Sequence, residues 1–217
     1  MTCVNGCGSA VAQVVLDHAP RSPCGHPGWR GDGAHTGGAQ AVGQPLGPVV
    51  HIRRDGRPVE GARLISNASS EIDILVYAGL FLTEDPALIK TFRAKAAAGA
   101  KIRLLFGDPR SREVAKRSAE ENIGPATIAA KIRNVLAFFR PLADEPAIEI
   151  RLHKTTLYNS IYRFDDDMFV NTHVYGSMAA HAPVLHLRRL SGGDLFDTYS
   201  ESFDVIWNES KPATWTT

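Results

Sequence analysis

Hydrophobic positions along the chain follow two patterns, and each predicts a different kind of element. Residues 71–82 and 101–107 form apolar runs rich in branched side chains, which is typical of strands buried on both faces of a sheet. A shorter run of the same type, at 184–190, predicts a further strand. Helical spacing of apolar residues, or a run of charged helix formers, predicts helices over 59–68, 86–98, 111–121, 128–139 and 195–210.

Residues 148–176 predict a long β-hairpin that reverses at the aspartates 165–167. Because side chains two apart on a strand share a face, polar groups of both strands would meet on one surface. We expect that surface to carry Arg151, His153, Thr155, Asn159, Asn171 and His173. Such a constellation resembles a binding site, although a hydrogen-bonded polar ladder on a half-exposed sheet is the alternative.

Strands and helices that alternate and then give way to a hairpin predict an α/β domain, with a mixed β-sheet flanked by helices. Ligands of such sheets tend to bind beyond the carboxyl ends of the parallel strands. The loops at 78–84 and 107–112 would therefore lie at one rim of the sheet. Whether His153 faces that rim does not follow from the pattern.

Composition divides the chain into three segments. Residues 1–55 are rich in glycine, proline and cysteine, and the first 50 residues hold ten of the 19 glycines but only four charged residues, which predicts a disordered tail. We expect a folded domain at 56–211 and a disordered C-terminus at 212–217. Four residues of the tail are of types that could bind zinc, but their irregular spacing favours no metal. They are Cys3, Cys7, Cys24 and His26.

Charge and hydropathy exclude several classes of protein. The net charge of +1 argues against strong nucleic-acid binding by the whole chain, since affinity for phosphates grows with the number of cationic contacts. The apolar run at 74–82 is far shorter than the ~20 residues of a membrane-spanning helix. The three cysteines all lie within the first 24 residues, so no disulfide framework holds the domain and a cytoplasmic location is expected.

Residues 59–210 resemble an uncharacterised bacterial family of phospholipase-D-like domains. The likeness is carried by the segments LVYAGLFLTEDP, GDPRS, LYNSIYRFDDDMFVNTHVYG, PVLHLRRLSGG and YSESFDVIW. The resemblance implies one phospholipase-D-like half with a histidine-bearing hairpin, usually found behind a helix-turn-helix module in transcriptional regulators. Residues 1–58 are too glycine-rich for such a module, so DNA binding by this chain alone is not expected. The segment is either a genuine tail or a misassigned start.

The resemblance also implies a site built from the pattern HxKxxxxD followed by a Gly-Ser step. The active site needs two copies of this pattern, and the histidine of one copy attacks phosphorus. His153 matches that histidine and is the implied nucleophile. Thr155 stands in place of the lysine, Ser160 in place of the aspartate, and residues 171–173 in place of Gly-Ser. Loss of one contact to a developing anion typically costs about 10²–10³ in rate, so phosphodiester binding survives these departures better than catalysis does.

Three functions follow. The first is a degenerate, ligand-sensing domain that binds a phosphorylated or nucleotide-like molecule for a transcriptional regulator. The second is a phosphodiester hydrolase or transferase that works as a homodimer, with His153 as the nucleophile. The third is a non-catalytic dimerisation module. We expect a homodimer and neither a cofactor nor a metal, and the sequence does not identify the ligand.

The ligand-binding residues expected for the first function combine the hairpin face with nearby loops and strands. They are Thr155, Asn159, Asn171, His173, Arg151, Asp108, His186 and Arg188. Arg151, Arg163 or Arg188 could replace the missing lysine, because arginine binds phosphate well. Asp108 has the alternative of capping the following helix, and His186 that of a satisfied, half-buried histidine.

Overall fold

The computed structural model describes residues 59–191 and 194–215. The tail predicted at 1–55, with its cysteines and His26, lies outside the described residues. Within them, no helix is long and apolar enough to cross a membrane.

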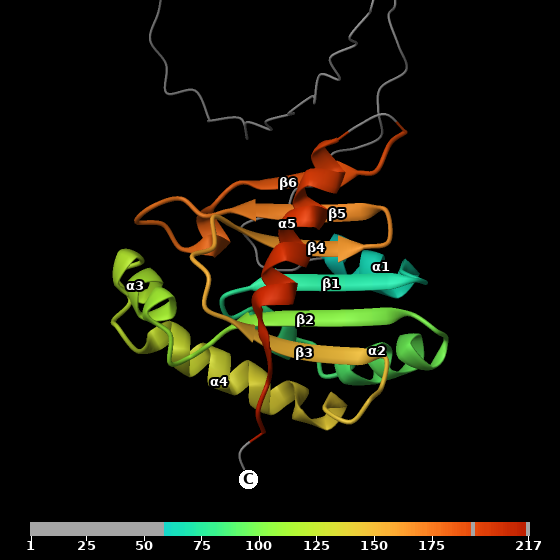
Figure 1. Cartoon of the computed structure of the whole chain (residues 1–217), viewed down its shortest axis with the longest axis horizontal. Helices are drawn as coiled ribbons and strands as arrows, with labels where there is room; N and C mark the ends of the chain where they lie inside the picture. Colours follow the sequence, from blue (N-terminus) through green and yellow to red (C-terminus); the bar gives the residue numbers. More distant parts are fainter. Residues whose placement is uncertain (1–58, 192–193, 216–217) are drawn as a thin grey trace, which may run out of the picture. The chain divides into compact units, whose positions relative to one another are not determined.

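A mixed β-sheet forms the centre of the described domain (Figure 1), and its seven strands lie in the order β6-β5-β4-β1-β2-β3-β7. Strands β1, β2 and β3 are parallel, whereas β4 runs antiparallel to β1, and β5, β6 and β7 run antiparallel to their neighbours. The bounds are β1 Glu71–Val76, β2 Lys101–Gly107, β3 Ile148–His153, β4 Asn159–Phe164, β5 Asp167–Thr172, β6 Val184–Arg188 and β7 Lys211–Pro212.

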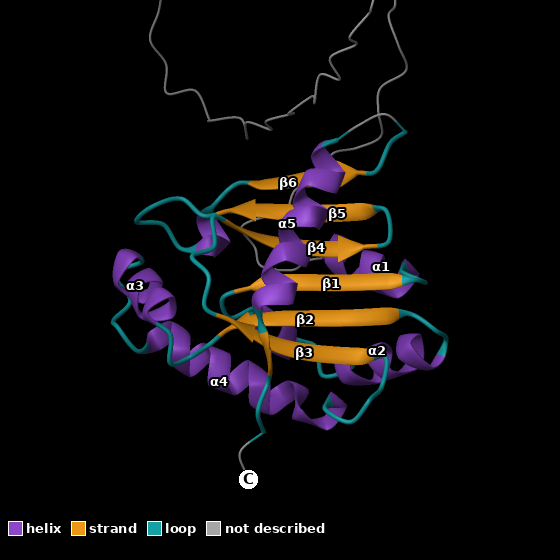
Figure 2. Cartoon of the chain, viewed as in Figure 1, coloured by secondary structure: helices purple, strands orange, loops and turns teal. Residues whose placement is uncertain are grey.

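Helices cover both faces of this sheet (Figure 2), so the predicted α/β fold class with a mixed sheet flanked by helices is confirmed. The α-helices are α1 Val59–Asn67, α2 Leu88–Ala97, α3 Arg112–Glu120, α4 Thr127–Phe139 and α5 Leu195–Glu209. Three short 3-10 helices connect them to the strands: η1 Leu80–Glu84, η2 Arg140–Leu142 and η3 Ala179–His181.

The two faces of the sheet differ in chemistry. On one face Phe106 of β2 stacks against Phe139 of α4, with ring centroids 5.8 Å apart. On the other face Arg103 of the same strand lies over Phe203 of α5, with its guanidinium carbon 4.6 Å from the ring centroid. Aromatic residues of α5 therefore pack on the sheet, as their helical spacing predicts.

The predicted hairpin forms around its expected turn but is shorter than predicted, because residues 148–153 do not belong to it. Strand β3 pairs in parallel with β2, and β1 and β2 lie between β3 and β4. The actual hairpin is β4–β5, which reverses at Asp165 and Asp166. The sequences of β3 and β4 are both typical of a strand and could have formed one continuous arm of a hairpin. They form two strands because β3 pairs with β2, which is distant in sequence. The expected common face of the polar residues is lost with the predicted long hairpin.

Two predicted boundaries also differ from the observed ones. The apolar run at 71–82 leaves the sheet after Val76, because Gly79 adopts a left-handed conformation with φ of 64° and starts η1. The folded domain was expected to end at residue 211. In the structure, Pro212 pairs with Arg151 at the edge of β3. The Ala213 amide continues this contact by donating to the Ile150 carbonyl over 2.9 Å.

A network of charged side chains lies buried between the sheet and α5. Arg103 donates to both carboxylate oxygens of Asp73, over 2.6 and 2.7 Å, and a third nitrogen donates to Asp204 over 2.6 Å. The Asp73 side chain is only 1% exposed, and its burial raises the pKa of this carboxyl although Arg103 acts in the opposite direction. Arg163 joins the network through Glu71, 2.6 Å away.

Asp165 ties the β4–β5 turn to the connection between α1 and β1. Its two carboxylate oxygens accept hydrogen bonds from the amides of Ser69, Ser70 and Glu71, over 2.8 to 2.9 Å. Burial raises the pKa of Asp165, but these hydrogen bonds outweigh it and lower the pKa to about 2.

Replacement of Asp165 by alanine is expected to lower the free energy of unfolding by about 1–2 kcal/mol, because it leaves three amides without an acceptor. Alanine also tolerates the left-handed φ of 53° poorly. Asp165→Asn keeps one acceptor and a residue that suits this conformation, so it should lose less. Urea unfolding of the three proteins checks the order, and equal stability of the alanine variant would contradict it.

Candidate functional site

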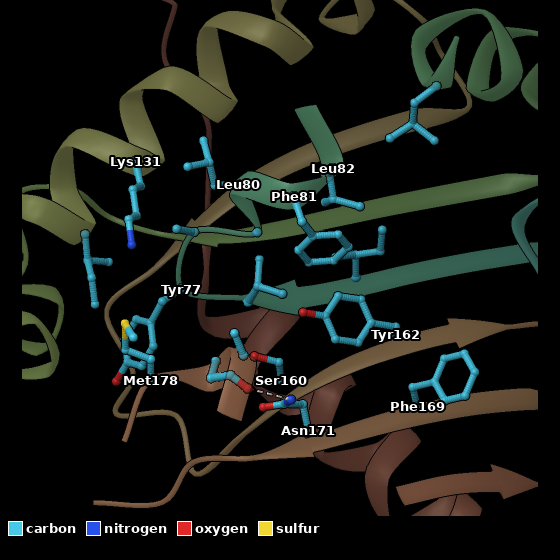
Figure 3. Close-up of a pocket in the computed structure, with 18 of the residues that line it drawn as sticks. Tyr77, Leu80, Phe81, Leu82, Lys131, Ser160, Tyr162, Phe169, Asn171 and Met178 are labelled. Atoms are coloured by element: carbon cyan, nitrogen blue, oxygen red, sulfur yellow. Dashed lines mark hydrogen bonds between the residues drawn. The ribbon is translucent and has the colours of Figure 1, made fainter. Parts of the chain in front are cut away.

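A cavity of about 470 Å³ opens on the face of the sheet opposite α5 (Figure 3). This volume lies within the range of about 300–1,000 Å³ that is typical of small-molecule sites. Its walls come from α1, β1, η1, α2, α3, α4, β4, β5 and η3. Most of the lining side chains are apolar, among them Ile65, Ile74, Val76, Leu80, Phe81, Leu82, Leu88, Ile128, Tyr162, Phe164, Phe169 and Met178.

Strand register divides the cavity into a polar and an apolar end. Ser160 of β4 pairs with Asn171 of β5 at the carboxyl edge of the parallel strands, so both lie at that end. Phe164 lies at the opposite end of β4, and Ile65 of α1 also lines the cavity. A ligand in this cavity would therefore meet hydrogen-bonding groups at the sheet rim and hydrophobic packing behind it.

His173 and Ser160 form the central hydrogen-bonded pair of the polar end. The Nδ1 atom of His173 lies 3.1 Å from the Leu157 carbonyl, which can only accept, so this nitrogen carries the proton. The Ser160 hydroxyl then donates to Nε2 over 3.0 Å. Burial lowers the pKa of His173 to about 4, so the imidazole is neutral at pH 7.

Tyr77, directly after β1, packs between the two histidines. Its ring stacks on His173, with centroids 5.6 Å apart, and meets His153 at 5.8 Å. Its hydroxyl accepts the Leu157 amide over 3.0 Å, and burial raises the pKa of this hydroxyl. The aromatic ring therefore separates the cavity from His153.

His153 lies at the carboxyl end of β3, but its ring is only 2% exposed and does not line the cavity. Its Nε2 donates to the Val76 carbonyl over 3.1 Å, and its Nδ1 accepts the Thr155 amide over 3.3 Å. Burial lowers the pKa of His153 to about 4. Because neither nitrogen has a free lone pair, this geometry disfavours the nucleophilic role expected for His153.

Of the expected ligand-binding residues, Asn171 and His173 line the cavity. The Asn171 side-chain nitrogen donates to the Ala179 carbonyl over 3.1 Å, and its buried oxygen has no partner in the described part of the chain. Buried polar atoms are usually paired, so this unsatisfied acceptor at the polar end is a candidate partner for a water or ligand donor.

Three other expected residues lie around the rim and outside the cavity lining. Asp108 is buried, accepts the Arg110 amide over 2.9 Å and lies 3.7 Å from the Lys154 ammonium. It does not cap the next helix, since Ser111 accepts the Val114 amide there. Thr155 holds the ring of His153 through its amide, and Asn159 pairs with Thr172 in the sheet.

The remaining three expected residues belong to other surfaces. Arg151 lies over the Trp207 ring of α5, on the face opposite the cavity, with its guanidinium carbon 4.5 Å from the centroid. His186 and Arg188 of β6 both bind Asp167, over 2.9 and 3.2 Å. The structure thus does not bring these arginines together with His153 or His173 in one phosphate site.

Several residues that line the cavity were missed from the sequence, namely Tyr77, Arg117, Lys131, Ser160 as a binding group, and Tyr162. Arg117 of α3 is buried, donates to Glu121 over 2.8 Å and to the Ser177 carbonyl over 2.8 Å. It thereby holds the segment that leads into η3 over the polar end. Solvated helix charges have the same sequence pattern, so no signal distinguished Arg117 or Lys131.

The described residues contain no group of three or more histidine, cysteine, aspartate or glutamate side chains that could hold a metal ion.

Comparisons with known proteins identify the family and the fold. A family model described as a domain of unknown function (DUF5919) matches residues 76–214. No curated protein matches the chain. Among solved structures, the chain is similar to TrmBL2, an archaeal chromatin protein whose structure shows a novel mode of DNA binding, with a TM-score of 0.50 and 14% sequence identity. Neither comparison names a phospholipase-D-like domain.

The similarity to TrmBL2 covers 78% of this chain and 55% of that protein. The chain thus spans about half the length of this relative. At 14% identity the likeness shows the fold alone.

Proposed function

Because the chain belongs to the DUF5919 family, whose function is unknown, we propose a function from its geometry: the domain senses a small organic ligand in the cavity described above. The observation that carries the proposal is this cavity, which is largely apolar and ends in a few hydrogen-bonding groups. Small-molecule sites have this construction, with apolar walls for affinity and few polar groups for orientation.

The position of α1 supports sensing rather than storage of the ligand. Ile65 and Ser66 of α1 line the cavity, and α1 is the first helix of the described domain. Its C-terminal end is fixed, because Lys95 donates to the carbonyls of Ser66 and Ala68 over 2.7 and 2.6 Å. A bound ligand would therefore contact the element that leads back to the N-terminal part of the chain.

We further propose that this sensing serves a transcriptional regulator in the cytoplasm, with the DNA contacts made by another module. The resemblance to domains found behind helix-turn-helix modules supports this context, and TrmBL2, which shares the fold, is itself a DNA-binding chromatin protein. That the chain forms a homodimer remains a prediction from the resemblance, and sedimentation equilibrium would test it by measuring the mass in solution.

A degenerate phospholipase-D-like origin is also part of the proposal. His153 ends a parallel strand in register with Gly107 of β2, at the rim where such a domain would hold phosphate. A phosphodiesterase is not supported, since both nitrogens of this buried ring are hydrogen-bonded and Thr155 stands where the pattern has its lysine. The imidazole instead ties the end of β3 to the end of β1.

Filling the cavity tests the proposed function. In a thermal-shift screen of small organic metabolites, phosphorylated and nucleotide compounds included, we expect some compounds to raise the Tm of the wild-type protein by mass action. Ala179 lines the cavity from η3, so Ala179→Trp should abolish these shifts.

Ala94→Trp provides the matched control, because Ala94 is exposed on α2 and does not line the cavity. It should leave the shifts intact. Compounds that stabilise the wild-type protein and Ala179→Trp equally would bind elsewhere and would contradict the proposal.

A further inference from the structure

The charged side chains of the cavity indicate what kind of ligand it takes. Four charged side chains line it: Arg117 and Glu121 from the α3 region, Lys131 from α4, and Asp85 between η1 and α2. Two are positive and two are negative, so the lining carries no net charge. Asp85 accepts the Ala87 amide over 2.9 Å and Glu121 is bound by Arg117 over 2.8 Å, so the partners of the two cations decide which charge a ligand meets. His173 adds none at pH 7, because burial lowers its pKa to about 4.

The charge of Arg117 is already compensated by protein groups. Its Nε lies 2.8 Å from Glu121, one terminal nitrogen lies 3.8 Å from Glu120, and the other donates to the Ser177 carbonyl over 2.8 Å. The side chain is 5% exposed, so this charge is compensated inside the protein. Its role is to hold the loop before η3.

Lys131 differs from Arg117 in this respect. Its side chain is half-buried, lines the cavity and extends from α4 toward Tyr77 and Met178 (Figure 3). Among the described residues, its ammonium has neither an ion pair nor a hydrogen bond. A partly desolvated ammonium without a partner gains most from an anion that enters the same space.

The rest of the cavity selects an apolar body. Phe81 meets the Tyr162 ring edge-on, with centroids 5.7 Å apart, and Phe169 and Leu82 extend the wall away from Lys131. Aromatic rings of a ligand would pack well against this wall. A second negative charge would find no cation, because Arg117 is already paired and Glu121 would repel it.

We propose that the ligand is an organic monoanion, with an apolar, ring-sized body in the cavity and one carboxylate bound by Lys131. This inference rests on the proposed sensing function and deepens it, since it excludes phosphate monoesters as preferred ligands. Tyr77 and Asn171 line the same end and complete the surroundings of the carboxylate.

Three probes with the same naphthalene body test the inference by isothermal titration calorimetry. Naphthoate carries one negative charge, naphthylmethanol none, and naphthyl phosphate nearly two at pH 7. We expect naphthoate to bind about tenfold more tightly than naphthylmethanol, as one charge-assisted hydrogen bond predicts. Naphthyl phosphate should bind no more tightly than naphthoate.

Lys131→Gln should remove the preference for naphthoate over naphthylmethanol while the binding of naphthylmethanol persists. Arg133→Gln is the matched control, because Arg133 is exposed on the same helix and outside the cavity lining. It should keep the full preference.

The outcomes separate the inference from the function on which it rests. An unchanged preference in Lys131→Gln, or tighter binding of naphthyl phosphate, would overturn the inference and leave the ligand site in place. Failure of all three probes to bind saturably would instead contradict both. Loss of binding in Ala179→Trp confirms that the measured site is the cavity.

Discussion

Arg103→Ala is expected to lower the free energy of unfolding by about 3–5 kcal/mol, the usual loss when one partner of a buried ion pair is removed. The reason is Asp73, whose side chain is 1% exposed and accepts two hydrogen bonds from Arg103. Without Arg103, its remaining cation is Arg163, 3.5 Å away. Phe203 and Trp207 of α5 would also lose the guanidinium on which they pack.

Urea unfolding followed by circular dichroism measures this loss. Arg110→Ala is the control, because the Arg110 side chain is 77% exposed and its Nε is as far as 3.6 Å from the Asp108 carboxylate. It should cost less than about 1 kcal/mol, as exposed ion pairs do. If Arg103→Ala costs no more than this control, the buried network does not hold α5 to the sheet.

Should Arg103→Ala fail to fold, the double variant Arg103→Met with Asp73→Leu keeps the test open. Replacement of a whole buried ion pair by apolar side chains is often neutral or stabilising, so this variant should be more stable than Arg103→Ala. The converse order would show that the cost arises from the changed packing of position 103 rather than from an uncompensated charge.

Acidification is expected to destabilise the domain by roughly 3 kcal/mol through His153 alone, at about 1.36 kcal/mol per pKa unit. Burial lowers the pKa of His153 from 6.5 to about 4. The unfolded chain therefore binds a proton before the folded one does. The stability is fully present above pH 6.5 and is lost as the pH falls from 6.5 to about 4.

His173 acts in the same direction, because burial lowers its pKa to about 4 as well. Unfolding free energies across this range, for the wild-type protein and for His153→Gln, measure the effect. The variant should show a shallower dependence on pH, even though it is less stable at neutral pH. His181→Gln, at an exposed position, should keep the wild-type slope. An identical slope in His153→Gln would contradict the assignment.

The fold could be predicted from sequence wherever one strand or helix carries its own signal. The runs at 71–76 and 101–107 are buried strands because both faces of the parallel sheet are covered. The helical spacing of Phe196, Phe203 and Trp207 correctly predicted a helix that packs on the sheet. Strand pairing could not be predicted, because β3 pairs with β2, more than forty residues away in the sequence, and no local pattern indicates that pairing.

The site was harder to predict because many separate elements build it. The alternation of side chains on a polar strand indicated that Asn171 and His173 share a face, and both line the cavity; their role as binding residues stays a prediction. The surroundings of His153 could not be predicted, because its two hydrogen bonds involve backbone groups of Val76 and Thr155, which leave no trace in the sequence. Lys131 was missed, because only the packing of α4 places this lysine in the cavity.

The central claim, that the cavity is a ligand site, is tested most directly by its methionine. The chain has three methionines. Met178 lines the cavity, Met168 is buried on β5 outside it, and Met1 lies beyond the described residues. In NMR spectra of methyl-labelled methionine, added naphthoate should shift the Met178 signal saturably and leave that of Met168 in place. A Met178 signal that does not move at saturating naphthoate would contradict the claim.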